Sequence, residues 1–279
     1  MPIEVRHLTH VYAPGTPFET RALNDISLTI RDGEFVGLIG HTGSGKSTFI
    51  QHLNALMKPT EGSVLVDGTD IFSGNGKNEV RRKVGLVFQY PEYQLFEETV
   101  EKDVGFGPRN QGLSEAEVRA RTEEALRLVN LPESEWQKSP FELSGGQKRR
   151  AAIAGVLAMK PKTLILDEPA AGLDPVGRAE MRNLIQSIHD RGNTVIMVSH
   201  SMDDVARLCQ RIIVMNHGSV ALDGTPEEVF ANGEALSAMH LGLPAAAQLR
   251  DRLNARGFSV PSDAFTVERM AKWLIDRRK

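Results

Sequence analysis

The chain has 279 residues, of which 41% are hydrophobic and 25% are charged, the ordinary proportions of a globular protein with a substantial core. Its formal net charge of −3 shows no global excess of basic residues, so we expect no nucleic-acid partner. The longest apolar runs are the length of a strand, whereas a membrane-spanning helix needs roughly 20 apolar residues. If the protein works at a membrane, another chain must cross it. The single cysteine, Cys209, cannot form an internal disulfide, which fits a reducing compartment.

Short strands and one glycine-rich loop are predicted for the N-terminal part. Alternating apolar and polar side chains, or compact apolar runs, predict strands at residues 3–11, 26–30, 35–39, 64–66 and 84–88. The loop Gly40–Ser47 follows the third of these runs, and residues 47–57 are predicted to form a helix that ends at Lys58-Pro59. This order of strand, loop and helix is the context in which such a loop binds phosphate.

Residues 89–158 are predicted to be mostly helical, inserted between strand-forming stretches. Ser114 and Glu117 form a capping box, which indicates the start of one helix. A second helix is predicted over residues 145–159.

Strands return in the following part at residues 163–166, 194–198 and 211–215. The first two are separated by a helix with one apolar face, formed by Met181, Leu184, Ile185 and Ile188. Strands that alternate with helices predict an α/β fold with a parallel sheet. The tail, about 226–279, contains glycine and proline breakers and is predicted to be a short helical appendage.

The loop Gly40–Ser47 matches the pattern G-x-x-x-x-G-K-[ST] in full. Its glycines let backbone N–H groups converge on phosphate oxygens, and the following helix adds its positive N-terminal end. Lys46 is expected to reach the β- and γ-phosphates of ATP, and Ser47 to bind Mg²⁺. The alternative, an incidental glycine turn, is disfavoured by the flanking strand and helix. The nucleotide-binding residues expected here are Gly40, His41, Thr42, Gly43, Ser44, Gly45, Lys46, Ser47 and Thr48.

Asp167 and Glu168 end the apolar strand at residues 163–166. Carboxylates at the end of such a strand lie where an α/β sheet binds ligands. We expect Asp167 to hold the Mg²⁺ shell, and Glu168 to orient and polarise the attacking water. Taken alone, the pair is equally well explained as turn or cap residues. The phosphate loop favours the chemical interpretation.

The stretch Leu143–Gln147 combines a hydroxyl, two glycines and an amide before the second predicted helix. This composition indicates a further anion site at a helix N-terminus. Taken alone, a plain helix start is the better explanation. Together with the phosphate loop, it predicts that one chain carries two phosphate-binding surfaces.

These segments together resemble the ATPase of ABC transporters over residues 3 to about 230. In that family Gly40–Ser47 corresponds to the Walker A loop, Leu143–Gln147 to the signature, and Asp167 with Glu168 to the end of Walker B. One departure is Ala170, where family members commonly have threonine or serine.

Smaller landmarks match the family in the same order. The resemblance implies that Tyr12 stacks on adenine, that Gln89 touches Mg²⁺ and the water, and that His200 senses the γ-phosphate. Gly172–Pro175 corresponds to the D-loop. A lone tyrosine is usually a packing residue, and a lone histidine is often only a hydrogen-bonded surface residue.

The resemblance implies a P-loop NTPase (RecA-like) α/β core with an N-terminal antiparallel β subdomain, formed by residues 1–88 and 159–225. Residues 89–158 would form a helical signature subdomain, and residues 226–279 a C-terminal helical extension. In this family two ATPase subunits pack head to tail. Nucleotide held by the partner is then expected to contact Ser144, Gly145, Gly146 and Gln147.

Finer stretches resemble one branch of the family, the energy-coupling factor (ECF) vitamin importers, and within it the second of two paralogous ATPases. They are Ala13–Glu19 together with Gly40–Gly43, Tyr93–Val100, Asp103–Pro108, Ser144–Arg150 and Leu241–Pro244. The branch implies a heterodimer of two ATPases beneath a transmembrane coupling subunit, with a separate membrane subunit that binds the substrate. The groove for the coupling subunit is expected within residues 89–108. The protein would lie peripherally on the cytoplasmic face of the cell membrane.

Three other interpretations stay open. The chain could be the ATPase of another ABC importer or exporter, or a non-transport ABC protein. The latter usually carry two cassettes or long coiled coils, and this chain has one cassette without sustained heptads. It could also be a degenerate cassette that binds ATP only to hold an assembly together. Glu168 and His200 argue against that interpretation.

Overall fold

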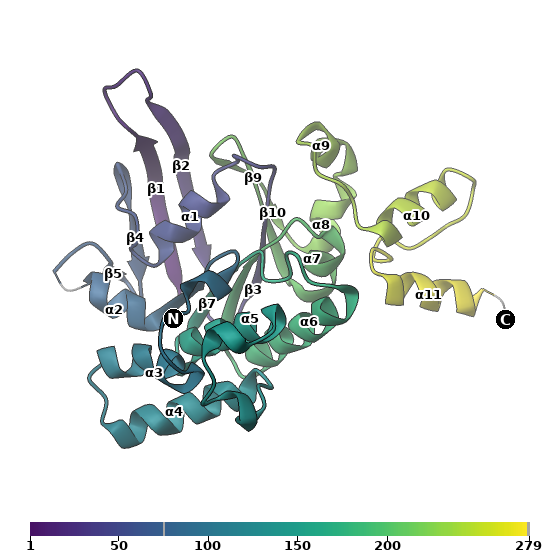
Figure 1. Ribbon diagram of the computed structural model, residues 1–279. Coiled ribbons are helices and arrows are strands. Elements are labelled where there is room, and N and C mark those ends of the chain that lie inside the picture. The colour runs from purple at the N-terminus through teal and green to yellow at the C-terminus, as the bar shows by residue number, and fades with distance from the viewer. Residues whose placement is uncertain (75, 278–279) are drawn as a thin grey trace.

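Two β-sheets organise the chain in the computed structural model, which describes residues 1–74 and 76–277 (Figure 1). The smaller sheet is antiparallel, with the order β2-β1-β4-β5. Its strands are β1 (Ile3–Tyr12), β2 (Thr20–Ile30), β4 (Glu61–Val66) and β5 (Thr69–Asp70). The N-terminal strand predictions are therefore confirmed, although β2 begins six residues before the predicted residue 26.

The larger sheet has the order β10-β9-β3-β8-β7-β6, and all its neighbouring pairs are parallel except β10 with β9. Its strands are β3 (Phe35–Ile39), β6 (Val84–Val87), β7 (Thr163–Asp167), β8 (Thr194–Val198), β9 (Arg211–Asn216) and β10 (Ser219–Gly224). The predicted parallel α/β sheet is confirmed. The edge strand β10 has no buried residue, so it lacks the apolar pattern by which the other strands are recognised.

Helices pack on both faces of the larger sheet. Helices α1 (Lys46–Leu53), α6 (Pro175–Asp190) and α7 (Met202–Leu208) belong to the region of the larger sheet, and α2 (Gly76–Lys83) precedes β6. Helix α1 ends four residues before the predicted end at Met57. The reason is local: Ala55 takes a left-handed φ of 58°, and the N–H groups of Leu56 and Met57 both bond to the carbonyl of Gln51.

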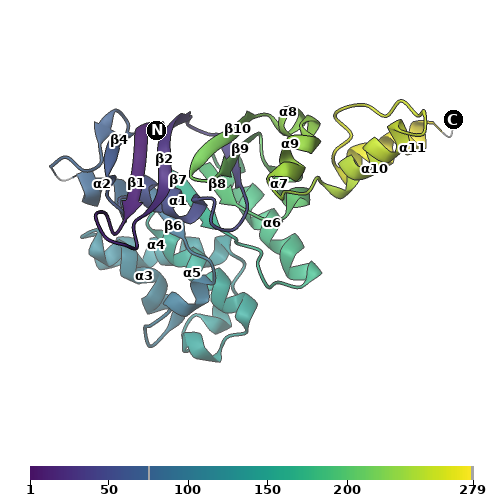
Figure 2. The same ribbon diagram turned by 90° about the horizontal axis from the view of Figure 1, so that it is seen from above.

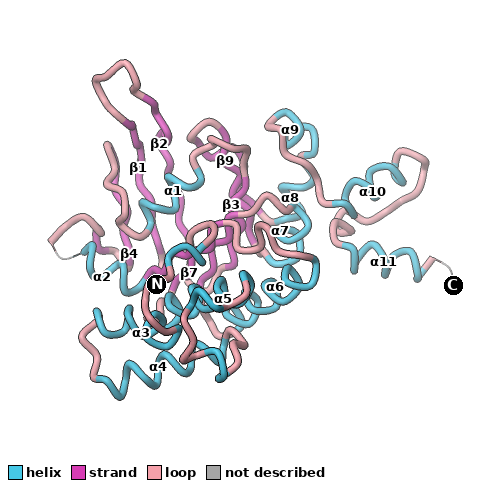
Figure 3. Tube along the Cα trace, in the orientation of Figure 1, coloured by secondary structure: helices cyan, strands magenta, loops and turns pink. Residues whose placement is uncertain are grey.

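A mostly helical segment lies between β6 and β7, as predicted, and gathers on one side of the larger sheet (Figure 3). It comprises α3 (Val100–Asn110), α4 (Glu115–Leu128), α5 (Gly145–Ala158) and the short 3₁₀ turns η1 (Pro91–Gln94), η2 (Glu133–Glu135) and η3 (Pro140–Glu142). The capping box of Ser114 and Glu117 forms at the start of α4.

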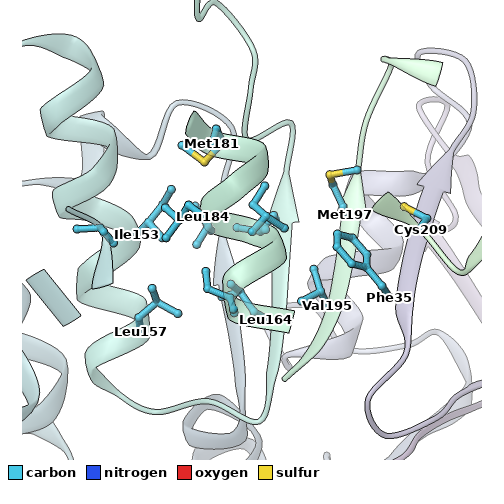
Figure 4. Close-up of a cluster of buried hydrophobic side chains, with 14 of the residues drawn as sticks. Phe35, Ile153, Leu157, Leu164, Met181, Leu184, Val195, Met197 and Cys209 are labelled. Atoms are coloured by element: carbon cyan, nitrogen blue, oxygen red, sulfur yellow. The ribbon is translucent and has the colours of Figure 1, made fainter. Parts of the chain in front are cut away.

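Two apolar cores lie on opposite faces of the larger sheet, because successive side chains of a strand point to opposite faces. One core joins the sheet to α5 and α6 (Figure 4), with Phe35, Ile153, Leu164, Met181, Leu184, Val195 and Met197 among its residues. The other joins the sheet to α1 and the antiparallel sheet, through Val36, Leu38, Phe49, Ile50, Ile165 and Ile196. The site described below lies at the end of this double-faced sheet.

The C-terminal part is helical, as predicted, and its last two helices project from the sheets (Figure 2). Its helices are α8 (Pro226–Ala231), α9 (Gly233–Ala238), α10 (Ala245–Asn254) and α11 (Val267–Asp276). Helices α10 and α11 enclose a small apolar cluster of their own. No helix within the described residues is long and apolar enough to cross a membrane.

Candidate nucleotide-binding site

A cleft of about 570 Å³ lies where β3, β7 and β8 end and α1 begins. Ends of parallel strands are where α/β sheets bind ligands. Most of the predicted site residues meet there although they are far apart in sequence. The lining comprises Tyr12, Thr20, Arg21, Ala22, Thr42, Gly43, Gly45, Lys46, Ser47, Thr48, Gln89, Asp167, Glu168, Val198 and His200.

The phosphate loop is packed tightly against its own chain. Gly45 has a φ of 102°, and a Cβ at this position would lie 2.7 Å from the carbonyl oxygen of Ala22. A Cβ on Gly40 would clash with the carbonyl oxygen of Met215. Only glycine fits both constraints, positive φ and close approach of another backbone. The shape of the loop therefore requires glycine at Gly40 and Gly45.

Lys46 begins α1 and folds its amine over the loop. Its Nζ donates to the carbonyl oxygens of Gly40 at 2.6 Å and His41 at 3.0 Å. Burial lowers the pKa of Lys46, and the charges of Glu168 and Asp167 oppose that shift. The ammonium group thus gives the loop a positive charge that suits a polyanion, and the two carboxylates lie near enough to interact with that charge.

Ser47 and Asp167 bring together two hard oxygen donors from different elements. The Ser47 hydroxyl donates to Asp167 Oδ2 at 3.5 Å. Burial raises the pKa of Asp167, while Lys46 and Ser47 lower it. Mg²⁺ binds through one or two protein oxygens together with phosphates and water, so this pair fits the ion. Across residues 1–74 and 76–277, no cluster of three or more His, Cys, Asp or Glu side chains offers a site of all-protein ligands.

Glu168 is held in a strained conformation directly after β7. Its φ is 50°, which is uncommon for a residue with a side chain. Oε2 accepts a hydrogen bond from the backbone N–H of His200 at 3.4 Å. The buried Oε1 accepts no hydrogen bond from the described residues, although His200 Nε2 lies 3.4 Å away. One oxygen of this cleft-lining carboxylate is therefore left without a hydrogen-bond partner among the described residues, which for a buried polar atom calls for an explanation.

The pKa of Glu168 is raised to about 7, first by burial and also by the charge of Asp167, against the His200 N–H and Lys46. A base with a pKa near the working pH is effective in proton transfer. His200 follows β8, and burial together with the charge of Lys46 lowers its pKa. At neutral pH the imidazole is accordingly neutral.

Tyr12 ends β1 at the cleft, and the residue is 39% exposed. Its hydroxyl and the Thr48 hydroxyl are 3.1 Å apart, which connects the ring to α1. The ring of His10 meets it edge to face, with centroids 4.6 Å apart. A ring held in this way presents an aromatic surface at the cleft wall.

Four lining residues were not predicted: Thr20, Arg21, Ala22 and Val198. The first three are on β2, where the strand pairing places Thr20 opposite Tyr12. Only the hairpin register brings them to the cleft, and no local pattern signals it. Conversely, Gly40, His41 and Ser44 do not line the cleft. The His41 ring turns toward β9, with Nε2 3.2 Å from Asn216 Oδ1.

The stretch Ser144–Gln147 does not line this cleft. Ser144 is the N-cap of α5, and Gln147 completes a capping box with it. A Cβ on Gly145 or Gly146 would meet no atom within 4 Å. The helix start thus presents two glycines to open space, in contrast to Gly40 and Gly45 of the phosphate loop.

Comparison with known proteins agrees with this geometry. Residues 23–171 match the family model described as ABC transporter, and residues 244–276 match the energy-coupling factor transporter EcfA1 C-terminal domain. The chain is 54% identical to the energy-coupling factor transporter ATP-binding protein EcfA2 of Clostridium perfringens, over 99% of this chain and 98% of that protein. It is 49% identical to the protein of the same name from Enterococcus faecalis, over 99% and 97%.

Solved structures show the same similarity. The chain aligns with cbiO1 from Clostridium perfringens, described as part of the ABC transporter complex cbiONQ, with a TM-score of 0.75 and 41% identity. That alignment covers 89% of this chain and 98% of cbiO1. The ATP-binding cassette MJ0796, in a post-hydrolysis state bound to ADP and Pi, aligns with a TM-score of 0.71 and 31% identity, over 80% and 98%.

These findings confirm the predicted branch and paralogue, since the curated relatives carry the EcfA2 name over the full chain length. The chain belongs to the ABC transporter family, and within it to the ATP-binding, ATP-hydrolysing subunits that energise importers of the energy-coupling factor type.

Proposed function

We propose that this ATPase works as half of a head-to-tail heterodimer with a paralogous ATPase, beneath a transmembrane coupling subunit. A separate membrane subunit binds the vitamin or other micronutrient. The dimer then lies peripherally on the cytoplasmic face of the cell membrane. The names of its relatives support this arrangement, because they belong to subunits of multi-protein transporters.

The exposed glycines of the signature carry this proposal. Glycine is a poor residue for a helix, and the chain itself has no use for it at Gly145 and Gly146, because a side chain there would meet nothing. An approaching ligand would need that room, and the N-terminus of α5 favours an anion. We therefore assign Ser144, Gly145, Gly146 and Gln147 to the nucleotide held by the partner.

Within its own cleft, the chain divides the work among side chains of different elements. The phosphate loop, with Lys46, holds the phosphates, and Thr48 and Tyr12 hold the nucleoside end. Ser47, Gln89 and Asp167 would hold Mg²⁺, which neutralises phosphate charge when bound. Glu168 accepts a proton from the attacking water through its carboxylate, whose Oε1 has no hydrogen-bond partner among the described residues. His200 lies beside that oxygen and senses the γ-phosphate.

The organisation into subdomains follows the same logic. Residues 1–88 and 159–225 form the nucleotide-binding core, residues 89–158 the helical signature subdomain, and residues 226–279 the C-terminal extension. ATP binding draws two such chains together across the core and signature surfaces, and hydrolysis releases them.

A second hollow, of about 700 Å³, supports the position of the coupling subunit. It lies between α2, η1, α3 and α5, and we call it the coupling groove. Phe96 and Phe106 line it, 59% and 42% exposed, with ring centroids 5.0 Å apart. Exposed aromatic rings in a hollow are typical of an interaction site. Helices of the coupling subunit would enter here.

Copurification tests the proposed assembly. A tagged chain expressed in its own host is expected to retain a second ATPase and membrane proteins, identified by mass spectrometry. Phe106→Asp, which puts a charge in the coupling groove, is expected to lose the membrane proteins but retain the second ATPase. Phe18→Asp, at the exposed Phe18 of the β1–β2 loop, is the control and retains both. A wild-type chain that associates with neither partner would refute the assembly.

A further inference from the structure

Arg149 joins parts of the molecule that no sequence pattern connects. It lies on α5, five residues after the start of the signature at Ser144, and is only 3% exposed. Its guanidinium makes a bidentate ion pair with Glu92 of η1, with Nε–Oε2 at 3.1 Å and Nη2–Oε1 at 2.9 Å. Bidentate pairs have a defined orientation as well as strength, so α5 and η1 are fixed to each other.

The same guanidinium also reaches the segment after the catalytic carboxylate. Nη1 donates to the carbonyl oxygens of Ala171 at 2.6 Å and Pro169 at 3.3 Å. The N–H of Ala171 in turn bonds to the carbonyl of Glu168 at 3.1 Å, which closes a turn. Arg149 therefore holds the turn in which Glu168 takes its strained φ of 50°.

A second contact runs parallel to this one. Tyr90, directly after Gln89, lies with its ring centroid 5.8 Å from the Arg149 guanidinium carbon. The same ring is next to Gly172, where a Cβ would be 3.9 Å from Tyr90 Cε1. The ring of Tyr90, in the segment that follows Gln89, thus lies next to both Arg149 and Gly172, which belongs to the segment that follows Glu168.

The ion pair is tight. Burial by itself would raise the pKa of Glu92, yet the hydrogen bonds and charge of Arg149 bring that pKa below its ordinary value. A buried pair of this kind is sensitive to loss of either partner, because the remaining charge is left without compensation. The junction therefore behaves as one rigid unit.

The junction also borders the coupling groove. Gln94 and Leu95, at the end of η1 and directly after it, line that groove, as do Ala152 and Val156 of the helix that carries Arg149. A helix seated in the groove would press on η1 and α5. Because Arg149 joins η1 to α5, a movement of the two together would be transmitted to the Pro169–Ala171 turn through the Arg149 guanidinium.

We infer that Arg149 is a positioning residue that transmits occupancy of the coupling groove to Glu168, with Glu92 as its counterpart on the groove side. The inference rests on the proposed function in one respect, that a membrane subunit occupies the groove. Arg149 does not line the cleft, so its effect on hydrolysis passes through the turn that it holds.

The test compares ATP hydrolysis in two assemblies, the detached ATPase heterodimer and the complete membrane complex. The readout is the ratio of their kcat values, measured by phosphate release at saturating ATP. The wild-type ratio is expected to differ from one by about fivefold or more, the size by which coupling between two binding sites typically changes affinity. Arg149→Lys, which loses the fork geometry, is expected to bring the ratio close to one.

Glu92→Gln provides an independent variant if Arg149→Lys fails to fold, because it keeps the size of the side chain and places an amide donor against the guanidinium. It too is expected to bring the ratio close to one. Arg250→Lys is the matched control: Arg250 is also buried, and donates to one carboxylate and two backbone carbonyls, but it lies in the C-terminal extension. Its ratio is expected to stay at the wild-type value.

A wild-type ratio of one, or a wild-type ratio retained in either Arg149→Lys or Glu92→Gln, would overturn the role of Arg149. Failure of the wild-type chain to copurify with membrane proteins would instead refute the proposed assembly, so the two failures are distinguishable. Thermal melting of each variant, with ATP affinity measured on the heterodimer, separates a loss of folding from a loss of transmission.

Discussion

Two glycine-rich helix starts in this chain look alike in sequence and differ in their surroundings. In the phosphate loop, a side chain on Gly45 would collide with the backbone of Ala22, and Lys46 closes over the loop. At the start of α5, a side chain on Gly145 or Gly146 would meet nothing within 4 Å. The first start is enclosed by its own chain, and the second faces outward.

The difference teaches that glycine has two distinct uses here. The phosphate loop needs it for a backbone conformation, which is a requirement of folding. The signature has helical backbone that any residue adopts, and no contact among the described residues requires glycine at Gly145 or Gly146. Two observations separate the starts: the positive φ of Gly40, Gly43 and Gly45, and the backbone atoms that a Cβ on Gly40 or Gly45 would meet.

The largest expected effect comes from Glu168→Gln, which is expected to trap ATP between the phosphate loop of one subunit and the signature of the other. Glu168→Gln removes the proton acceptor while keeping its shape, so phosphate release is expected to fall roughly 10²- to 10⁴-fold. ATP then remains between one chain's loop and the other's signature, and a stable ATP-bound dimer accumulates, detectable by size-exclusion chromatography. Turnover at the wild-type rate would remove Glu168 from the role of base.

The next largest effect is a loss of ATP affinity at the phosphate loop alone. Lys46→Ala removes a charged donor to phosphate, so ATP affinity is expected to fall roughly 10- to 100-fold. Fluorescent-nucleotide titration of the isolated chain measures it, because this half of the site lies within one chain. Arg119→Lys, at the exposed Arg119–Glu123 pair of α4, is the control with unchanged affinity. Wild-type affinity in Lys46→Ala would contradict the assignment of the loop.

The pH dependence of hydrolysis tests Glu168, the carboxylate that lines the same cleft as the phosphate loop. The folded-state pKa of Glu168 is raised from 4.5 to about 7, so its base form disappears as the pH falls through about 7. Accordingly kcat/KM is expected to fall about tenfold between pH 6.5 and pH 5.5. His200 has a pKa below its ordinary 6.5, so it does not account for a limb near 7. The residual activity of Glu168→Gln should lack this limb.

The sign for stability is the opposite of the sign for activity. Because the folded pKa of Glu168 lies above the unfolded one, protonation favours the folded state. This contribution is fully present below pH 4.5 and is lost as the pH rises through about 7.

For the activity prediction, a flat kcat/KM profile between pH 5.5 and 8 would show that a group other than Glu168 sets the rate.

The smallest effects are the most direct test of the comparison. Gly45→Ala forces a side chain into a φ of 102° and against Ala22, so the free energy of unfolding is expected to fall by about 1–3 kcal/mol. Gly146→Ala relieves a poor helix former in open space, so stability is expected to stay or rise by up to about 1 kcal/mol. Urea denaturation of the isolated chain measures both.

The same Gly146→Ala substitution is expected to impair the ATP-bound dimer that accumulates in a Glu168→Gln background. A variant that is at least as stable as the wild type but assembles less well would confirm an outward-facing role. If Gly146→Ala destabilised the isolated chain as much as Gly45→Ala, the distinction between the two starts would be wrong.

Much of the fold was predictable because its signals are local. The buried strands β3, β7 and β8 are continuous apolar runs, and the capping boxes at Ser114 and Ser144 mark two helix starts. Other features depend on distant partners. Helix α1 ends early through a turn at Ala55, and β10 pairs at the sheet edge without an apolar pattern.

The candidate site divides in the same way. The order of the phosphate loop, signature and Asp167-Glu168 was sufficient to indicate the chemistry, and the resemblance added Tyr12, Gln89 and His200. Arg21 enters the cleft only through the register of β1 with β2. No pattern along the chain could predict that register, because it depends on which residues of β1 and β2 lie opposite each other in the folded sheet.

By itself, the sequence determined the backbone conformations and the chemical groups: glycines at the phosphate loop, a lysine and a serine at the start of α1, and carboxylates at the end of β7. Local propensity and side-chain chemistry suffice for these. The tertiary structure alone decided which groups meet, which glycines face outward, and that one buried arginine, Arg149, joins η1 to the turn that follows Glu168. Such contacts form between segments far apart in sequence, so packing of the two cores, rather than any local signal, sets them.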